Sequence, residues 1–274
     1  MLEADLLAAY PPEVAVPAAT VAADVARAGR VLVVLDDDPT GTQSVADLPV
    51  LTRWEVDDLR WAVEQGAPAL YVLTNTRSLD PADAERRNRE VVANALAAAD
   101  GATLGFVSRS DSTLRGHYPL EPTVIADVLE QRAGRGTDAV VIVPAFPDAG
   151  RITVGGVHYT RGPDGTLVPV AQTEFARDAT FRYSSSALAE YVEEKSGGRF
   201  VAADVIGLDL TLVRGSAEGI ADALDAATRS TPVVVDVVTE NDLRCLALGL
   251  AESERRGRKL DRKSGSAGMP RPIS

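Results

Sequence analysis

Short apolar runs rich in Val, Ile and Leu alternate along the chain with longer Ala-rich segments whose apolar residues recur at helical spacing. The short runs predict strands, and the longer segments predict helices. Regular alternation of the two is typical of a mostly parallel sheet with helices on both faces. The sequence therefore predicts an α/β fold with a Rossmann-like three-layer arrangement, whose strands lie at residues 31–36, 69–74, 103–108, 139–143, 202–206 and 232–237.

Two of the predicted helices carry clear start signals. Asp80 is followed by Pro81 and Asp83, and Thr239 precedes Asp242 by three residues, as in capped helix starts. The alternation breaks at residues 155–170, where a Gly pair and a Pro-Asp-Gly turn are flanked by β-forming residues. This segment predicts a hairpin excursion from the main sheet.

The end of the chain has a different composition. Residues 257–274 are rich in basic residues, Gly, Ser and Pro, and their apolar residues follow no helical or strand period. Such a segment buries too little apolar surface to offset the entropy of ordering. We therefore expect one folded domain over residues 1–256 and a disordered, divergent tail over 257–274.

The composition and net charge of the chain disfavour several kinds of binding partner. The 274 residues are 45% hydrophobic and carry a net charge of −12, which disfavours attraction to nucleic acid or to an anionic membrane. No run of about 18 apolar residues is present to span a bilayer, and the acidic first ten residues do not resemble a secretory signal. A single cysteine excludes an internal disulfide. The sequence predicts a cytoplasmic protein that binds neither nucleic acid nor membrane.

Polar clusters follow four of the predicted strands. They lie at residues 36–43, 74–78, 108–116 and 144–151. In an open parallel sheet, ligands bind at the carboxyl ends of the strands, so these four clusters are the candidate site.

The residue types in these clusters favour a small anionic ligand. Asp36, Asp37 and Asp38 repel one another, so they need a cation, ligand hydroxyls or an arginine nearby, unless they form a solvated acidic turn. The Ser-Asp-Ser-Thr-Leu-Arg-Gly segment at 110–116 offers hydroxyl and amide donors. Arginines at the same strand ends would make a locally positive pocket in an acidic molecule.

Other candidate groups favour structural roles. His117 and His158 are each more typical of hydrogen-bonded structural histidines, and Cys245 lies among leucines at helical spacing. No Gly-x-Ser-x-Gly elbow is present, and none of the three lysines follows a phosphate-binding loop. The sequence thus offers no cradle for ATP.

The first two clusters are compatible with a phosphatase. Asp36, Asp38 and Thr40 form Asp-x-Asp-x-Thr after an apolar strand, and a second apolar strand ends in Thr74. Both resemble the first motifs of haloacid-dehalogenase-type phosphatases, but the expected later lysine and acidic pair are missing.

A longer set of motifs resembles another family. Asp-Asp-Pro-Thr-Gly at 37–41, Ser-Asp-Ser-Thr-Leu-Arg-Gly at 110–116, Pro-Ala-Phe-Pro at 144–147 and Gly-Arg-x-Thr at 150–153 occur in order. Together they resemble the N-terminal half of the four-carbon acid sugar kinase family over residues 31 to about 256.

The resemblance implies an enzyme that uses ATP and Mg²⁺ to phosphorylate the terminal hydroxyl of a sugar acid such as threonate, erythronate or an oxo-tetronate. It also implies two domains, of which the N-terminal one binds the sugar acid and the C-terminal one binds the nucleotide. We expect the nucleotide domain to be absent from this chain, because the sequence departs from the family at about Arg258. The chain would then be a truncated kinase, or an inactive binding module that needs a nucleotide-binding domain in trans.

Roles for individual residues follow from the resemblance and from residue chemistry. Asp38, or else Asp37, would take the proton of the attacking hydroxyl, and both could help hold Mg²⁺. Arg115 would clamp the substrate carboxylate, with Arg77 or Arg151 as the second choice. The remaining residues expected to contact the substrate are Thr40, Gly41, Ser110, Asp111, Ser112, Thr113 and Gly116.

Overall fold

The structure is a computed structural model that describes residues 2–39, 46–162 and 164–264. Its centre is a parallel sheet of eight described strands in the order β2-β3-β1-β4-β11-β5-β10-β9. The strands are β1 (Arg30–Asp36), β2 (Val50–Leu51), β3 (Ala69–Leu73), β4 (Thr103–Arg109), β5 (Ala139–Val143), β9 (Ile206–Leu208), β10 (Thr231–Val235) and β11 (Leu260–Ser264).

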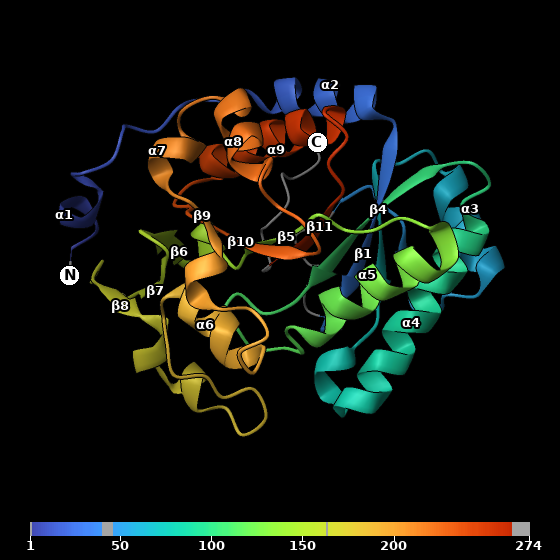
Figure 1. Ribbon diagram of the computed structural model, residues 1–274, viewed down its shortest axis with the longest axis horizontal. Coiled ribbons are helices and arrows are strands. Elements are labelled where there is room, and N and C mark those ends of the chain that lie inside the picture. The colour runs from blue at the N-terminus through green and yellow to red at the C-terminus, as the bar shows by residue number, and fades with distance from the viewer. Residues whose placement is uncertain (1, 40–45, 163, 265–274) are drawn as a thin grey trace.

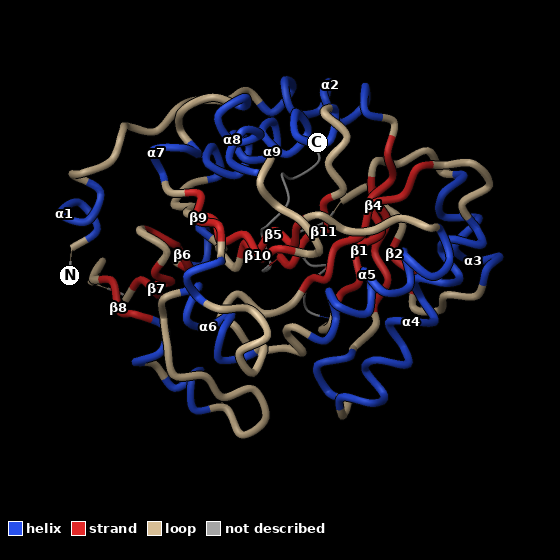
Figure 2. Tube along the Cα trace, viewed as in Figure 1, coloured by secondary structure: helices blue, strands red, loops and turns tan. Residues whose placement is uncertain are grey.

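Helices cover both faces of this sheet, as Figures 1 and 2 show. In the view of Figure 1, α2, α8 and α9 lie above the sheet, and α4, α5 and α6 lie below it. The predicted three-layer α/β fold is therefore confirmed. The helices are α1 (Glu3–Leu7), α2 (Ala18–Ala28), α3 (Val56–Glu64), α4 (Pro81–Ala98), α5 (Leu120–Ala133), α6 (Leu188–Lys195), α7 (Leu210–Val213), α8 (Ala217–Leu224) and α9 (Glu240–Arg255).

Both predicted helix starts are confirmed. The Asp80 side chain accepts a hydrogen bond from the Asp83 amide at the start of α4, and Pro81 is the first residue of that helix. Thr239 and Asp242 form a reciprocal capping box at the start of α9. Both caps satisfy amides that an α-helix leaves without a partner in its first turn.

The core is divided into separate apolar clusters. One cluster packs α3, α4 and α5 against β1, β3 and β4, with Leu35 and Phe106 at its centre. Another packs α8 and α9 against β5 and β10, around Val141 and Val233. Because β4 and β5 both pair with β11, that strand joins the two halves of the sheet.

The predicted hairpin is confirmed and is part of a second, antiparallel sheet. This sheet contains β6 (Arg151–Val154), β7 (Val157–Arg161) and β8 (Leu167–Pro169). Gly155 and Gly156, both with positive φ, form the turn between β6 and β7. Their amides donate to the Asp236 carboxylate at 2.6 and 2.8 Å, which anchors the hairpin to the end of β10.

Two sequence predictions are wrong. Residues predicted as a strand at 202–206 form a 3-10 helix at Ala202–Asp204, and the strand begins only at Ile206. The disorder expected from Gly257 is wrong for residues 257–264, because Leu260–Ser264 is a central strand. Its charged side chains find buried partners, such as Thr137, which donates to Asp261 at 2.6 Å. Residues 265–274 lie outside the described part of the chain.

None of the helices in the described ranges is both long and apolar enough to cross a membrane.

Candidate functional site

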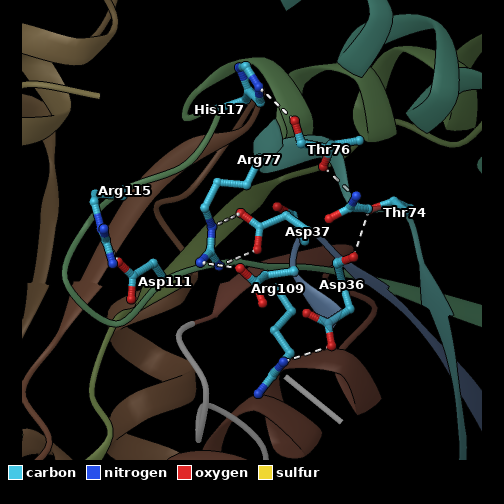
Figure 3. A network of polar contacts seen from close by, with 12 residues as sticks. Asp36, Asp37, Thr74, Thr76, Arg77, Arg109, Asp111, Arg115 and His117 are labelled. Carbon is cyan, nitrogen blue, oxygen red and sulfur yellow. Dashed lines mark hydrogen bonds and ion pairs between the residues drawn. The ribbon is translucent and has the colours of Figure 1, made fainter. Parts of the chain in front are cut away.

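The carboxyl ends of β1 and β3 meet in an ion-pair cluster around Arg77. This guanidinium donates to both carboxylate oxygens of Asp37, at 3.1 and 2.5 Å, and to Asp38 at 3.0 Å. Figure 3 shows Arg77 reaching across to Asp37. The repulsion within the acidic triplet is therefore relieved by an arginine from the next strand end.

Asp36 and Asp37 are buried but face different partners. Asp36 pairs with Arg109 at 2.8 Å, with both side chains almost fully enclosed. An acid so enclosed is a poor nucleophile for an external substrate, which argues against the phosphatase interpretation. Asp38 has 28% of its side chain exposed, so it is the acid of the three that reaches the rim.

The charge state of Asp37 is finely balanced. Its burial, and next the negative charge of Glu121, raise the pKa of Asp37 to about 7, although Arg77 and Lys263 oppose the shift. Glu121 is held beneath the site by Thr76 and Ser108, whose hydroxyls donate to it at 2.6 and 2.7 Å. The Asp37 carboxyl thus titrates near neutral pH.

The loop at residues 110–116 lies against this cluster. Gly116 has a φ of +130°, and a Cβ built there would lie 3.0 Å from Asp37 Oδ2 and 3.0 Å from Ser110 Cβ. A glycine is required because a side chain would press on the carboxylate that holds Arg77. The loop and the acidic segment are therefore built against each other.

Within the loop, Asp111 organises its neighbours. It accepts hydrogen bonds from the Thr113 hydroxyl and from Arg115 Nε. Burial acts against its charge, but these hydrogen bonds, together with the positive charges of Arg115 and Arg77, outweigh it and hold the pKa of Asp111 below its ordinary value. Asp111 is thus a carboxylate at neutral pH, and the Thr113 hydroxyl serves the loop itself.

Three side chains from outside the loop hold its main chain. His158 lies 2.7 Å from the Ser112 carbonyl, Tyr183 donates to the Thr113 carbonyl at 2.8 Å, and Tyr191 donates to the Leu114 carbonyl at 3.1 Å. His158 comes from β7, which shows why the hairpin sheet matters to the site. The loop is therefore fixed before any ligand arrives.

The expected structural roles of the histidines agree with these contacts. His117 Nε2 lies 3.0 Å from the Thr76 carbonyl, and the ring packs edge-on against Phe181. His158 is fully buried, and burial lowers its pKa to about 4. Both side chains position main chain around the site.

Two further arginines pack against one aromatic ring. Arg115 and Arg151 lie over the same Phe175 ring, at 5.2 and 5.9 Å from its centroid. Arg115 comes from the loop after β4, and Arg151 is both the last residue of the fourth polar cluster and the first residue of β6. Nothing in the sequence pairs Phe175 with them, since it lies in a short 3-10 helix far along the chain.

The structure brings together most of the residues predicted for the site. Asp37, Asp38, Arg77 and the 110–116 loop form one connected cluster, and Arg151 approaches through Phe175. Thr40 and Gly41 lie outside the described residues. Sequence reasoning noted that Glu121 follows the 110–116 motif but gave neither it nor Lys263 a role in the site, because their partners lie far away in the sequence.

A magnesium ion does not fit the acids as they stand. Both Asp37 oxygens already bind Arg77, and no group of three or more His, Cys, Asp or Glu side chains within the described ranges is arranged to hold a metal ion. We therefore derive no step through a metal at Asp37 and Asp38.

The model of the sugar-binding N-terminal domain family matches residues 32–271. The chain belongs to this family. The chain is similar to two kinases over about two thirds of its length. It is 32% identical over 183 residues to a D-erythronate kinase of Heliobacterium modesticaldum and 26% identical over 178 residues to a D-threonate kinase of Cupriavidus necator. These matches confirm the resemblance to the four-carbon acid sugar kinase family.

The two alignments include 66% and 65% of this chain, but only 37% and 38% of the lengths of the two relatives. Among solved structures, the domain resembles a protein of unknown function from Bordetella bronchiseptica, crystallised as a domain-swapped dimer with bound citrate. The two are 26% identical with a TM-score of 0.64, over 88% of this chain and 56% of the other. A Haemophilus influenzae protein, 17% identical with a TM-score of 0.59, shares the fold over 87% of this chain and 54% of the other.

Proposed function

We propose that this domain binds a four-carbon sugar acid, such as erythronate or threonate, at the carboxyl ends of β1, β3 and β4. The bound acid would present its terminal hydroxyl for phosphorylation by ATP. The names of the D-erythronate and D-threonate kinase relatives support this substrate class. Since the chain spans about 37% of the D-erythronate kinase, we propose that ATP binding resides in a separate nucleotide-binding domain.

The observation that carries the proposal is the pairing of Arg115 and Arg151 around Phe175. Both guanidinium groups lie against the same ring, and each offers the fork of donors that suits a carboxylate. Arg77 is less suited, because Nε and both terminal nitrogens of its guanidinium donate to Asp37 or Asp38, whereas Arg115 donates to Asp111 through Nε. The citrate bound by the Bordetella bronchiseptica relative, itself a carboxylate ligand, is consistent with this site.

The acid that accepts the hydroxyl proton is, in this proposal, Asp38. Its carboxylate is partly exposed, and Arg77 fixes its direction at 3.0 Å. Asp37 is enclosed, and its role is indirect: its two carboxylate oxygens hold Arg77 through two parallel hydrogen bonds. Positioning a hydroxyl next to a fixed carboxylate supplies the orientation and proton transfer that phosphoryl transfer needs from this half of the enzyme.

Calorimetric titration of the 274-residue chain tests this function. We expect D-erythronate or D-threonate to bind and the uncharged polyol erythritol to bind far more weakly. Replacing Arg115 with Ala removes charge-assisted hydrogen bonds worth about 1.5–3 kcal/mol, so affinity should fall about 10- to 150-fold. Arg177→Ala is the matched control, since Arg177 is an exposed arginine in the same 3-10 helix as Phe175.

If erythritol binds as tightly as the sugar acids, or if Arg115→Ala binds them with unchanged affinity, Arg115 does not bind the substrate carboxylate. Absence of binding by both sugar acids would refute the substrate class. Release of phosphate from sugar phosphates by this chain would instead favour the phosphatase alternative.

A further inference from the structure

The central strands of a parallel sheet are normally apolar, but the central strand β11 carries a buried lysine. Lys263, on β11, has only 8% of its surface exposed. It pairs in register with Ser108 on β4 and with Ile142 on β5, so its side chain shares their face of the sheet. The next residue, Ser264, accepts a hydrogen bond from the Ser110 amide at 2.9 Å. The end of β11 is therefore part of the wall of the site.

The face that Lys263 shares with Ser108 is the face of the buried acids. Ser108 donates to Glu121 at 2.7 Å. Burial lowers the pKa of Lys263, whereas the negative charges of Glu121 and then of Asp37 oppose this shift and favour the ammonium. Arg77 holds Asp37 from the other side. Two carboxylates and two cations thus lie together, all but Arg77 nearly fully enclosed.

Such a group is stable only while its charges balance. A buried charge that loses its partner carries the full cost of desolvation. Arg77 alone cannot balance Glu121 and Asp37, and it is also shared with Asp38. Lys263 on β11 adds a second buried cation on the face of the sheet where Ser108 donates to Glu121.

We propose that Lys263 is a positioning residue of the sugar-acid site: its ammonium balances Glu121 and Asp37, so that Asp37 remains a carboxylate able to hold Arg77. Arg77 in turn directs Asp38 toward the ligand. This inference rests on the proposed function for its ligand, but the charge balance itself does not depend on which ligand binds.

The direction of the effect follows from the groups that face Asp37. These are Arg77 from the segment after β3, Glu121 from α5 and Lys263 from β11, with Asp36 and Asp38 on its own segment. Burial and Glu121 favour the neutral acid, whereas Arg77 and Lys263 favour the carboxylate. Removing the Lys263 ammonium must therefore raise the pKa of Asp37 above about 7.

The test compares Lys263→Met with Lys259→Met in the full 274-residue chain. Lys259 is exposed and immediately precedes the same strand, so it controls for loss of a lysine. D-erythronate binding is titrated from pH 6 to pH 9, and the carboxyl ¹³C shift of Asp37 is followed, assigned with Asp37→Asn. In Lys263→Met, we expect affinity at pH 7 to fall at least tenfold and to recover toward pH 9, with the Asp37 midpoint moved upward. Lys259→Met should match the wild type.

A charge-balanced double variant separates electrostatics from packing. Adding Glu121→Gln to Lys263→Met removes one charge of each sign, so the Asp37 midpoint should return toward the wild-type value. If Lys263→Met does not fold, Glu121→Gln alone still tests whether these charges set the titration of Asp37. Removing the negative charge of Glu121 should lower the pH at the midpoint of that titration.

Two outcomes would overturn the inference. One is an Asp37 midpoint that stays unchanged in both Lys263→Met and Glu121→Gln. The other is a loss of affinity in Lys263→Met that is the same at every pH. If the wild type binds no sugar acid, the proposed function fails, but the ¹³C titration still decides the role of Lys263.

Discussion

Replacing Gly116 with Ala should disturb both the fold and the candidate site. At φ +130°, a residue other than glycine is strained by about 1–3 kcal/mol. The new methyl group would also lie 3.0 Å from Asp37 Oδ2 and from Ser110 Cβ, closer than ordinary contact. Either the loop or the carboxylate must move.

The magnitude follows from what that movement disturbs. Asp37 Oδ2 accepts the 3.1 Å hydrogen bond from Arg77 Nε, and hydrogen bonds to charged groups contribute about 1.5–3 kcal/mol. We therefore expect Gly116→Ala to lower the free energy of unfolding by about 2.5–6 kcal/mol. Weakening the Arg77 contact by about 1.4 kcal/mol would also reduce sugar-acid affinity tenfold.

The control is Gly134→Ala at the end of α5. Gly134 also has positive φ, at +59°, but a Cβ there would meet nothing within 4 Å. It should cost about 1–2 kcal/mol of stability and leave affinity unchanged. Urea unfolding and calorimetric titration measure both effects. If the two alanine variants behave alike in affinity, Gly116 does not serve the Asp37 carboxylate and our reasoning about the loop is wrong.

Two predictions concern the side chains that hold the 110–116 loop. His158 has its pKa lowered to about 4, so the folded state resists its protonation and stability is lost as pH falls from 6.5 to 4. His158→Gln should flatten this loss by about 3 kcal/mol, as measured by urea unfolding at several pH values, and an unchanged slope would contradict the assignment. Tyr183→Phe removes the donor to the Thr113 carbonyl, so stability should fall by about 1 kcal/mol and sugar-acid affinity with it. Unaltered affinity would show that the loop keeps its shape without Tyr183.

The sequence by itself determined the parts of the fold whose signals are local. Strand β5 lies at the predicted residues because Ala139–Val143 is a continuous apolar run between polar segments. The starts of α4 and α9 were predictable because a capping side chain bonds to an amide only three residues away. The clustering of polar residues at the strand ends was predictable too, since parallel strands bring their carboxyl ends to one edge.

Strand β11 is the element that the sequence by itself predicted least well. Its Leu-Asp-Arg-Lys-Ser segment has none of the apolar character of a central parallel strand. It is stable there because Thr137 binds Asp261, Glu254 binds Arg262, and the buried acids face Lys263. Glu254 lies only eight residues before Arg262, but Thr137 and the buried acids lie far away in the sequence, so local composition predicted disorder instead.

The site shows the same division. The motifs named Asp37, Arg77, Arg115 and Arg151 as candidates, but their pairing depends on strand order and on loops that cross the sheet. Only the tertiary structure showed that Arg77 is engaged by two aspartates, while Arg115 and Arg151 share the Phe175 ring. Burial and neighbouring charges act through space. The pKa of Asp37, about 7, therefore depends on groups that only the folded chain brings together, and no single segment of the sequence predicts it.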